Sequence, residues 1–253
     1  MNETIWLAGA GLLAGMMNAL AGGGSFVSLP ALVAAGVPSV SANASSTVAL
    51  YPGGVASAWV YRDGLKEVGG VPLAPSLATT VVGGLAGALL LLFTSNAAFD
   101  RILPWLLLVA TVVLVLGPRL GALLRQRFRA GRTTVLVIQF ALGVYGGYFG
   151  GAVGLMMMAA WSLLDTADVK QMAPARTLMV TGANTIAVIC FALAGAVWWL
   201  QTAAVGVGAL AGGYVGAWLG KRLPAKLVRG GTILIAAGMT IAFFIRAYGP
   251  HAS

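Results

Sequence analysis

A run of three glycines interrupts an otherwise apolar stretch near the start of the chain. Gly22, Gly23 and Gly24 lie between two segments, 5–20 and 26–35, that are almost wholly apolar. Glycine weakens a helix interior, so the run predicts two short helices rather than one. Within a membrane, the backbone groups freed by such a break cannot face lipid, which offers them no hydrogen-bond partner. The break must therefore face protein or a water-filled cavity.

Composition places these segments in a membrane. The chain of 253 residues is 59% apolar and only 8% charged, with a mean hydropathy of +0.93. A soluble domain has about 25% charged residues, and a chain this poor in charge could not cover a soluble surface. The net charge of +9 is concentrated in two loops, 119–132 and 221–229, that adjoin apolar segments. Such clusters are typical of cytoplasmic loops of an inner-membrane protein, not of nucleic-acid binding.

Stretches of about 20 apolar residues predict six spans and two broken hairpins, hence about 8–10 membrane segments in an all-α polytopic protein. Both hairpins return the chain to the side it entered from, so both basic loops lie on the cytoplasmic side. Both termini then lie in the periplasm. The predicted spans are 41–61, 71–93, 102–116, 175–200, 202–219 and 231–248, and the hairpins are 5–35 and 133–164.

The two halves of the chain resemble each other. A glycine pattern recurs at an offset of 132 positions, and two shorter blocks recur in the same order, which indicates a duplication. We expect a first repeat, 1–118, and a second, 133–253, joined by the basic cytoplasmic loop 119–132. Each has one hairpin and three spans, so the second copy is inverted, and a site is expected where the two breaks meet. The recurring glycines are Gly11, Gly15 and Gly22, then Gly143, Gly147 and Gly154.

Catalytic and metal-binding chemistry has little support. All six acidic residues are expected in loops or near the termini, which also leaves no intramembrane carboxylate for a proton relay. Cys190 lies in an apolar segment and His251 is close to the end. We therefore expect no enzyme, no metal site and no cofactor. The acids are Glu3, Asp63, Glu67, Asp100, Asp165 and Asp168.

The breaks themselves suit an anion. Ser25 is a candidate N-cap for a helix that starts after the first glycine run. Free backbone N–H groups and the positive end of that helix would attract negative charge, and glycine lets a ligand approach the backbone closely. Gly150, Gly151 and Gly154 offer the same in the second half. Alternatively, these glycines only allow helices to cross closely.

Polar side chains accompany the breaks. Asn43, Ser45, Ser46 and Thr47 form a cluster at the start of an apolar helix and could donate to an anion, or could simply cap and link helices. At the equivalent place in the second half stands Arg176. Directed inward it would anchor an anion; directed outward it is one more cytoplasmic charge.

Two amides, Asn18 and Asn184, lie deep in apolar segments, where an unpaired polar group is costly. Each therefore needs a partner, which is either the substrate or a neighbouring helix.

The stretch from Gly15 to Leu32, followed by 36–38 and 42–47, resembles the TauE/SafE sulfite exporter family of membrane transporter permeases. The segment 184–187 resembles that family's second-half asparagine motif. One departure stands out: the family tends to keep three glycines followed by a proline in the second half, whereas this chain reads Gly154, Leu155 and then Met156–Met158, without the proline. The resemblance implies transport of sulfur-containing anions such as sulfite, thiosulfate or organosulfonates, usually outward. By position it implies a site at Asn18, Gly22–Gly24, Asn43–Ser46, Gly150–Gly154, Arg176 and Asn184.

The leading hypothesis is a secondary transporter of a small sulfur-containing anion, working by alternating access and exporting its substrate. A passive anion channel and a non-transporting membrane assembly subunit are the alternatives. The expected partners are the anion and the lipid bilayer, and a homodimer is compatible with the sequence. Substrate, direction and coupling ion stay open at this point.

Overall fold

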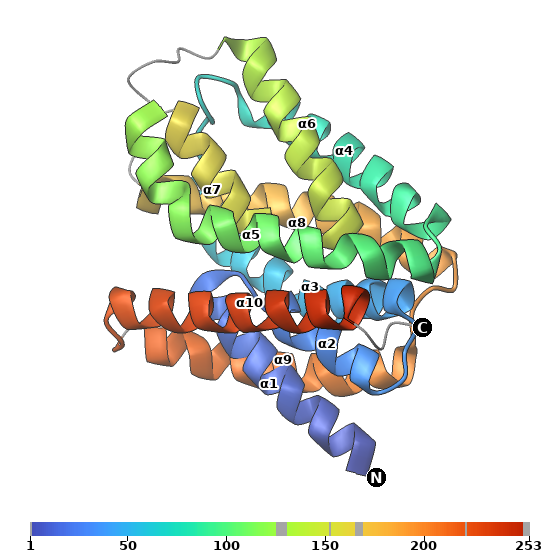
Figure 1. The fold of residues 1–253 in the computed structure, drawn as a ribbon. Coiled ribbons are helices and arrows are strands. Elements are labelled where there is room, and N and C mark those ends of the chain that lie inside the picture. Colours follow the sequence, from blue (N-terminus) through green and yellow to red (C-terminus); the bar gives the residue numbers. More distant parts are fainter. Residues whose placement is uncertain (1, 125–130, 152, 165–168, 221, 250–253) are drawn as a thin grey trace.

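The computed structural model describes residues 2–124, 131–151, 153–164, 169–220 and 222–249. The described chain is built almost entirely of α-helices, as the sequence predicts (Figure 1). The helices are α1 (Asn2–Ala21), α2 (Ser25–Ala34), α3 (Ser39–Tyr61), α4 (Leu73–Phe93), α5 (Asn96–Leu124), α6 (Arg132–Phe149), α7 (Val153–Leu164), α8 (Val169–Leu193), α9 (Trp199–Gly220) and α10 (Ala225–Tyr248), with a short 3-10 helix, Arg62–Gly64, after α3.

Two long helices, α3 and α8, lie side by side in the middle of the molecule (Figure 1). The hydroxyls of Tyr51 on α3 and Thr185 on α8 are hydrogen-bonded at 2.9 Å, and Thr181 donates to the carbonyl of Gly54 at 3.2 Å. Residue numbers rise along one helix as they fall along the other, so the pair is antiparallel. α1 and α9 pack against α3, whereas α4 and α6 pack against α8.

Glycines bring α1 into contact with α9, and α6 into contact with α4. A Cβ added at Gly212 would lie 2.6 Å from the carbonyl carbon of Leu12, and closer still to its oxygen. At Gly147 it would lie 2.7 Å from the carbonyl carbon of Gly84. Real Cβ atoms do not approach so closely, so any side chain here would separate the helices. Small residues that let backbones touch are typical of helix packing in membranes.

Both breaks occur where the sequence predicts them. α1 ends at Ala21 and α2 begins at Ser25, and Gly22 has a φ of +74°. Gly24, rather than Ser25, is the N-cap of α2. The second hairpin turns at Gly150, whose φ is +70°, a left-handed conformation that suits glycine.

The second break is shorter than predicted. Gly154 lies in the first turn of α7, which begins at Val153, rather than in the break itself. One left-handed residue, Gly150, is enough to end α6. The sequence prediction of a break extending to Gly154 is therefore wrong by about one helical turn.

Among the described residues, five helical segments are long and apolar enough to cross a membrane, and they lie in α4, α5 (Asn96–Leu116), α8, α9 and α10. The predicted span 175–200 is too long, because α8 ends at Leu193. There Gly195 turns with a φ of +65°, and its N–H and that of Ala196 bond back to carbonyls of the last turn. This Schellman arrangement ends the helix although the sequence stays apolar.

α5 begins earlier and ends later than the predicted span 102–116. Its early start places Asp100 in a helix rather than a loop, where the carboxylate accepts a hydrogen bond from Ser39 at the start of α3. Its end at Leu124 extends into the predicted basic loop 119–132. Residues 125–130 of that loop lie outside the described part of the chain.

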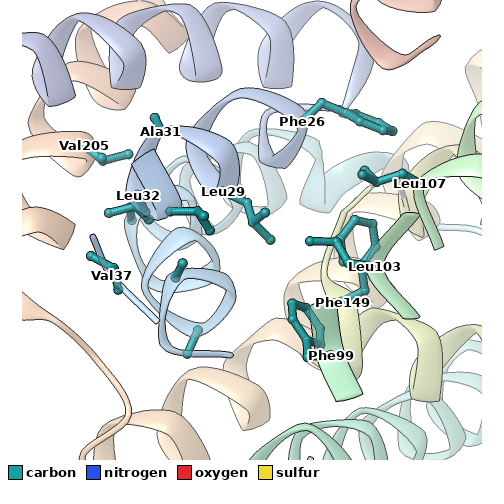
Figure 2. Packing of buried hydrophobic residues seen from close by; sticks show 14 of the residues in the cluster. Phe26, Leu29, Ala31, Leu32, Val37, Phe99, Leu103, Leu107, Phe149 and Val205 are labelled. Atoms are coloured by element: carbon teal, nitrogen blue, oxygen red, sulfur yellow. The ribbon is translucent and has the colours of Figure 1, made fainter. Parts of the chain in front are cut away.

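A buried apolar cluster formed by α2, α5 and α6 adjoins both breaks (Figure 2). Phe26, Phe99, Leu103 and Phe149 are each at most 1% exposed. Phe26 follows the first glycine run by two positions, and Phe149 directly precedes Gly150. Hydrophobic packing of these two side chains therefore fixes the position of each break.

Candidate functional site

The polar first half of α3 is the best candidate for a functional site. Its residues 43–47 are at most 6% exposed, although four of the five are polar. Buried polar side chains are costly unless they are hydrogen-bonded. The partners of these side chains therefore show what this part of α3 does.

The first break contacts α3 on one side. Ser28, in the second turn of α2, is hydrogen-bonded to Ser46 on α3 at 2.6 Å and also donates to the carbonyl of Gly24. A Cβ added at Gly24 would lie 2.8 Å from that of Asn18 and 3.1 Å from the side chain of Leu50. The structure thus brings Asn18, Gly24 and Ser46 together.

The second break contacts α3 on another side. Asn43 donates from Nδ2 to the carbonyl of Tyr148, the residue before Phe149, at 2.9 Å. A Cβ added at Gly150 would lie 2.9 Å from Oγ1 of Thr47. Asn43 and Thr47 are one turn apart on α3, so both face the end of α6. Two breaks that are distant in sequence therefore meet the same two turns of one helix.

Aromatic rings lie against Gly23 and Gly151, whereas a Cβ added at Gly22 would meet nothing within 4 Å. A Cβ added at Gly23 would lie 3.2 Å from a ring carbon of Phe26. A Cβ added at Gly151 would lie 2.6 Å from a ring carbon of Phe149. Ser25 is buried beside them, at 8% exposure. Both glycine runs are therefore closed on one side by a phenylalanine.

Ser45 has a structural partner instead. Its Oγ accepts a hydrogen bond from the backbone N–H of Trp198 at 3.0 Å, in the turn between α8 and α9. The side chain links α3 to that turn and contacts neither break in this arrangement. Of the predicted polar cluster, Asn43 and Ser46 lie at the breaks, while Ser45 does not.

Arg176 lies against the first turn of α7, which follows the second break. Its Cδ is 3.5 Å from the position that a Cβ of Gly154 would take, and the guanidinium Nε is 3.8 Å from it. The side chain is half-buried, and no hydrogen bond or salt bridge joins its guanidinium to the part of the chain that the structure describes. The guanidinium thus lies beside the first turn of α7.

Asn184 shares a face of α8 with Arg176. Val180, between them, also contacts Gly154, at 3.6 Å. Side chains four residues apart lie on one face of a helix, so Asn184 lies one turn further along the face that meets α7. Its Oδ1 is buried and accepts no hydrogen bond from any residue that the structure describes.

Three residues at the site escaped the sequence prediction: Ser28, Thr47 and Tyr148. Ser28 follows Gly24 by one helical turn, a spacing that could have indicated its contact with the break. Thr47 belonged to the polar cluster but was not assigned to the site. Tyr148 contributes only a backbone carbonyl, for which sequence gives no signal. Among the described residues, no group of histidine, cysteine and acidic side chains could hold a metal ion.

These features define a class of protein. The described part of the chain is helical, with five span-length apolar helices and two broken helices that meet at a buried polar helix. This is the construction of a polytopic membrane transporter.

The comparisons agree with this class. The family model described as Sulfite exporter TauE/SafE matches residues 7–243, and the chain belongs to this family. The chain is 31% identical over 242 residues to "Probable membrane transporter protein YfcA" of Escherichia coli (strain K12), covering 94% of this chain and 88% of that protein.

Two further relatives have similar printed names. A "Probable membrane transporter protein" of Haemophilus influenzae is 28% identical over 238 residues, which is 94% of this chain and 90% of that protein. "Probable membrane transporter protein ORF9" of Sinorhizobium sp is 25% identical over 236 residues, covering 92% and 88%. No solved structure matches this chain. The family resemblance seen in the sequence is thus confirmed, and the chain is a membrane transporter.

Proposed function

We propose that this chain is a secondary transporter that moves a small sulfur-containing anion, such as sulfite, thiosulfate or an organosulfonate, out across the bacterial inner membrane. One observation carries the proposal: the first break lies at Ser46 and the second at Thr47, on adjacent positions of α3. An anion bound there would contact both halves of the chain at once. Its binding could then be linked to their relative movement.

The groups at the breaks suit an anion. The N–H groups of Gly23, Gly24 and Ser25 make no backbone hydrogen bond within the described chain, and they lie at the positive end of α2. Arg176 supplies the one formal positive charge, beside the first turn of α7. Neutral donors and a single guanidinium can select an anion and still release it.

Alternating access between inverted repeats is the proposed mechanism. The backbone of Ala8 contacts Gly208, and the backbone of Phe140 contacts Gly83. Ala8 and Phe140 are 132 positions apart, the offset of the glycine repeat. The same correspondence recurs one turn later, with Leu12 at Gly212 and Val144 at Gly87. This supports residues 1–118 and 133–253 as inverted repeats whose relative rocking would expose the site to each side in turn.

Export fits the electrostatics. With the basic loops cytoplasmic, the inside-negative membrane potential favours the exit of an anion by about 2.3 kcal/mol per charge per 100 mV. Outward movement then needs no proton relay. Asp100, which the structure places in the first turns of α5, is bonded to Ser39 at the far end of α3 from Arg176.

Counterflow in proteoliposomes tests the proposal. Vesicles loaded with unlabelled sulfite, thiosulfate, sulfoacetate, sulfate or chloride would be diluted into a trace of labelled substrate. A carrier for sulfur anions accumulates label transiently in vesicles loaded with its substrate, and not in those loaded with chloride. A channel equilibrates label without this overshoot, and no response to any sulfur anion would contradict the proposal.

Two variants locate the site. Gly23→Leu fills the first break and should abolish counterflow, while Gly9→Leu, on the exposed side of α1 where a Cβ meets nothing within 4 Å, should not. Arg176→Ala removes charged hydrogen bonds worth about 1.5–3 kcal/mol, which weakens binding roughly 10- to 150-fold. Arg176→Lys keeps the charge and should recover part of the loss. Unchanged affinity in Arg176→Ala would place this arginine outside the site.

A further inference from the structure

Asn43, the buried amide that joins α3 to the second break, has an oxygen without a partner. Its side chain is 1% exposed, and Nδ2 donates to the carbonyl of Tyr148. No described residue donates to Oδ1. Buried acceptors are rarely left unpaired. An oxygen of sulfite or of a sulfonate is itself an acceptor and cannot fill this role, so the missing partner has to bring a donor or a positive charge.

Further oxygens lie at the same place, because α6 ends there. The last carbonyls of a helix lack intrahelical partners and form the negative end of its dipole. At the first break, the N–H of Gly22 bonds back to the carbonyl of Asn18 at 2.8 Å. No corresponding bond from Gly150 to Gly146 is formed in the described chain. The end of α6 therefore keeps an acceptor that the end of α1 has satisfied.

The hydroxyl of Thr47 approaches the same point. Its Oγ1 lies 2.9 Å, and the carbonyl oxygen of Gly146 lies 3.7 Å, from the position that a Cβ of Gly150 would take. Thr47 donates its proton to the backbone carbonyl of Asn43 at 3.0 Å, so its oxygen retains lone pairs. The hydroxyl oxygen of Thr47 and the carbonyl oxygen of Gly146 thus both lie close to Gly150, and the Asn43 amide is one turn before Thr47 on α3.

A second unpaired amide oxygen belongs to Asn184 on α8. Oδ1 of Asn184 is also buried and without a donor among the described residues. It lies on the face of α8 whose neighbouring turn, at Val180, contacts Gly154. Buried amide oxygens without a donor among the described residues are therefore found on both α3 and α8.

We propose that the second break binds a monovalent alkali cation, with sodium as the first candidate, through Asn43 Oδ1, Thr47 Oγ1 and the last-turn carbonyls of α6. Neutral oxygens suit such an ion, whereas Ca²⁺ and Mg²⁺ sites use carboxylates, and no acidic cluster lies among the described residues. Unwound carbonyls and half-helix C-terminal ends are known donors for sodium in transporters. This inference rests on the proposed function: the bound ion holds α3 against α6 and thereby shapes the site for the anion.

Thermal unfolding in detergent without any sulfur anion tests the cation site independently of transport. Sodium chloride and potassium chloride would each be titrated against N-methylglucamine chloride, at constant chloride and ionic strength. We expect a saturable rise in Tm with sodium or potassium over N-methylglucamine. Equal Tm values in all three salts would overturn the cation site and leave the anion proposal untouched.

Variants separate the site from general salt effects. Thr47→Val removes Oγ1 while keeping the shape of the side chain, and it should weaken the cation response at least tenfold, as should Asn43→Ala. Thr79→Val is the matched control, because the Thr79 hydroxyl donates to a backbone carbonyl one turn earlier on α4, at 2.7 Å, as Thr47 does on α3. It should leave the rise in Tm with sodium or potassium unchanged. Should Asn43→Ala fail to fold, Thr47→Val decides. A full cation response in Thr47→Val would refute the proposed ligands.

Discussion

Two adjacent glycines on α9 provide a stringent test of how the helices are packed. Gly212 faces α1, and a Cβ there would lie 2.6 Å from the carbonyl carbon of Leu12. Gly213, the next residue, has nothing within 4 Å of the same position. Alanine at either site brings the same gain in helix propensity, about 1 kcal/mol. The difference between Gly212→Ala and Gly213→Ala therefore isolates the contact with α1.

The magnitude follows from the geometry. Ordinary contact begins at 3.4 Å, so α1 and α9 would have to separate by roughly 1 Å along an interface of interlocked backbones. Forcing extra atoms into such packing costs about 1–3 kcal/mol. For a chain of this size, 1 kcal/mol shifts Tm by about 2–4 °C. Gly212→Ala should therefore unfold about 2–12 °C below Gly213→Ala.

Tryptophan fluorescence of the purified variants during heating measures this difference. Unfolding of membrane proteins is often irreversible, so both variants need the same detergent and heating rate. The two Tm values should differ in the stated direction, with Gly213→Ala at or above the unsubstituted chain. Equal Tm values, within 1 °C, would refute direct backbone contact between α1 and α9.

Three further substitutions should have distinct effects on the thermal stability. Gly150 and Gly36 both have a positive φ, +70° and +83°, so alanine is strained at either position. Gly150→Ala should nevertheless lower Tm more than Gly36→Ala, because only at Gly150 would the added Cβ lie 2.9 Å from a hydroxyl oxygen. Equal decreases in Tm would show that this contact does not contribute. Gln139→Leu should lower the free energy of unfolding by about 1–3 kcal/mol, because the buried indole N–H of Trp161 then loses its acceptor, the Gln139 amide oxygen at 3.0 Å. An unchanged Tm would contradict this expectation. Ser28→Ala should lower the free energy of unfolding by about 1 kcal/mol, because the hydrogen bond to Ser46 on α3 is lost. A variant with a higher Tm would argue against that bond.

Much of the architecture could be predicted from local sequence. Glycine adopts a left-handed conformation at little cost, so the glycine runs indicated the breaks at Gly22 and Gly150, although the second run did not show that Gly154 is helical. Low charge and long apolar runs identified a membrane protein, because a surface with so few charged residues is compatible with lipid but not with water. The end of α8 was missed, since one Gly195 in an apolar run is a weak signal until its neighbours close the Schellman hydrogen bonds.

The candidate site was predicted only in part. Asn43, Ser46 and Arg176 were recognised as polar residues in apolar surroundings, and the structure places all three beside a break. Ser45 had the same sequence features, yet it bonds to the backbone of Trp198. Residue type shows that a buried polar group needs a partner, but only the packing of distant helices decides which partner it finds.

The sequence by itself determined the class, the family and the position of each break, because these depend on hydropathy, on glycine and on motifs that are local in the chain. The tertiary structure decided that the two breaks meet on α3, and that the oxygens of Asn43 and Asn184 are buried without a donor in the described chain. Both facts arise from contacts between residues more than 100 positions apart, such as Asn43 with Tyr148. Such contacts depend on how whole helices pack, which no local pattern encodes.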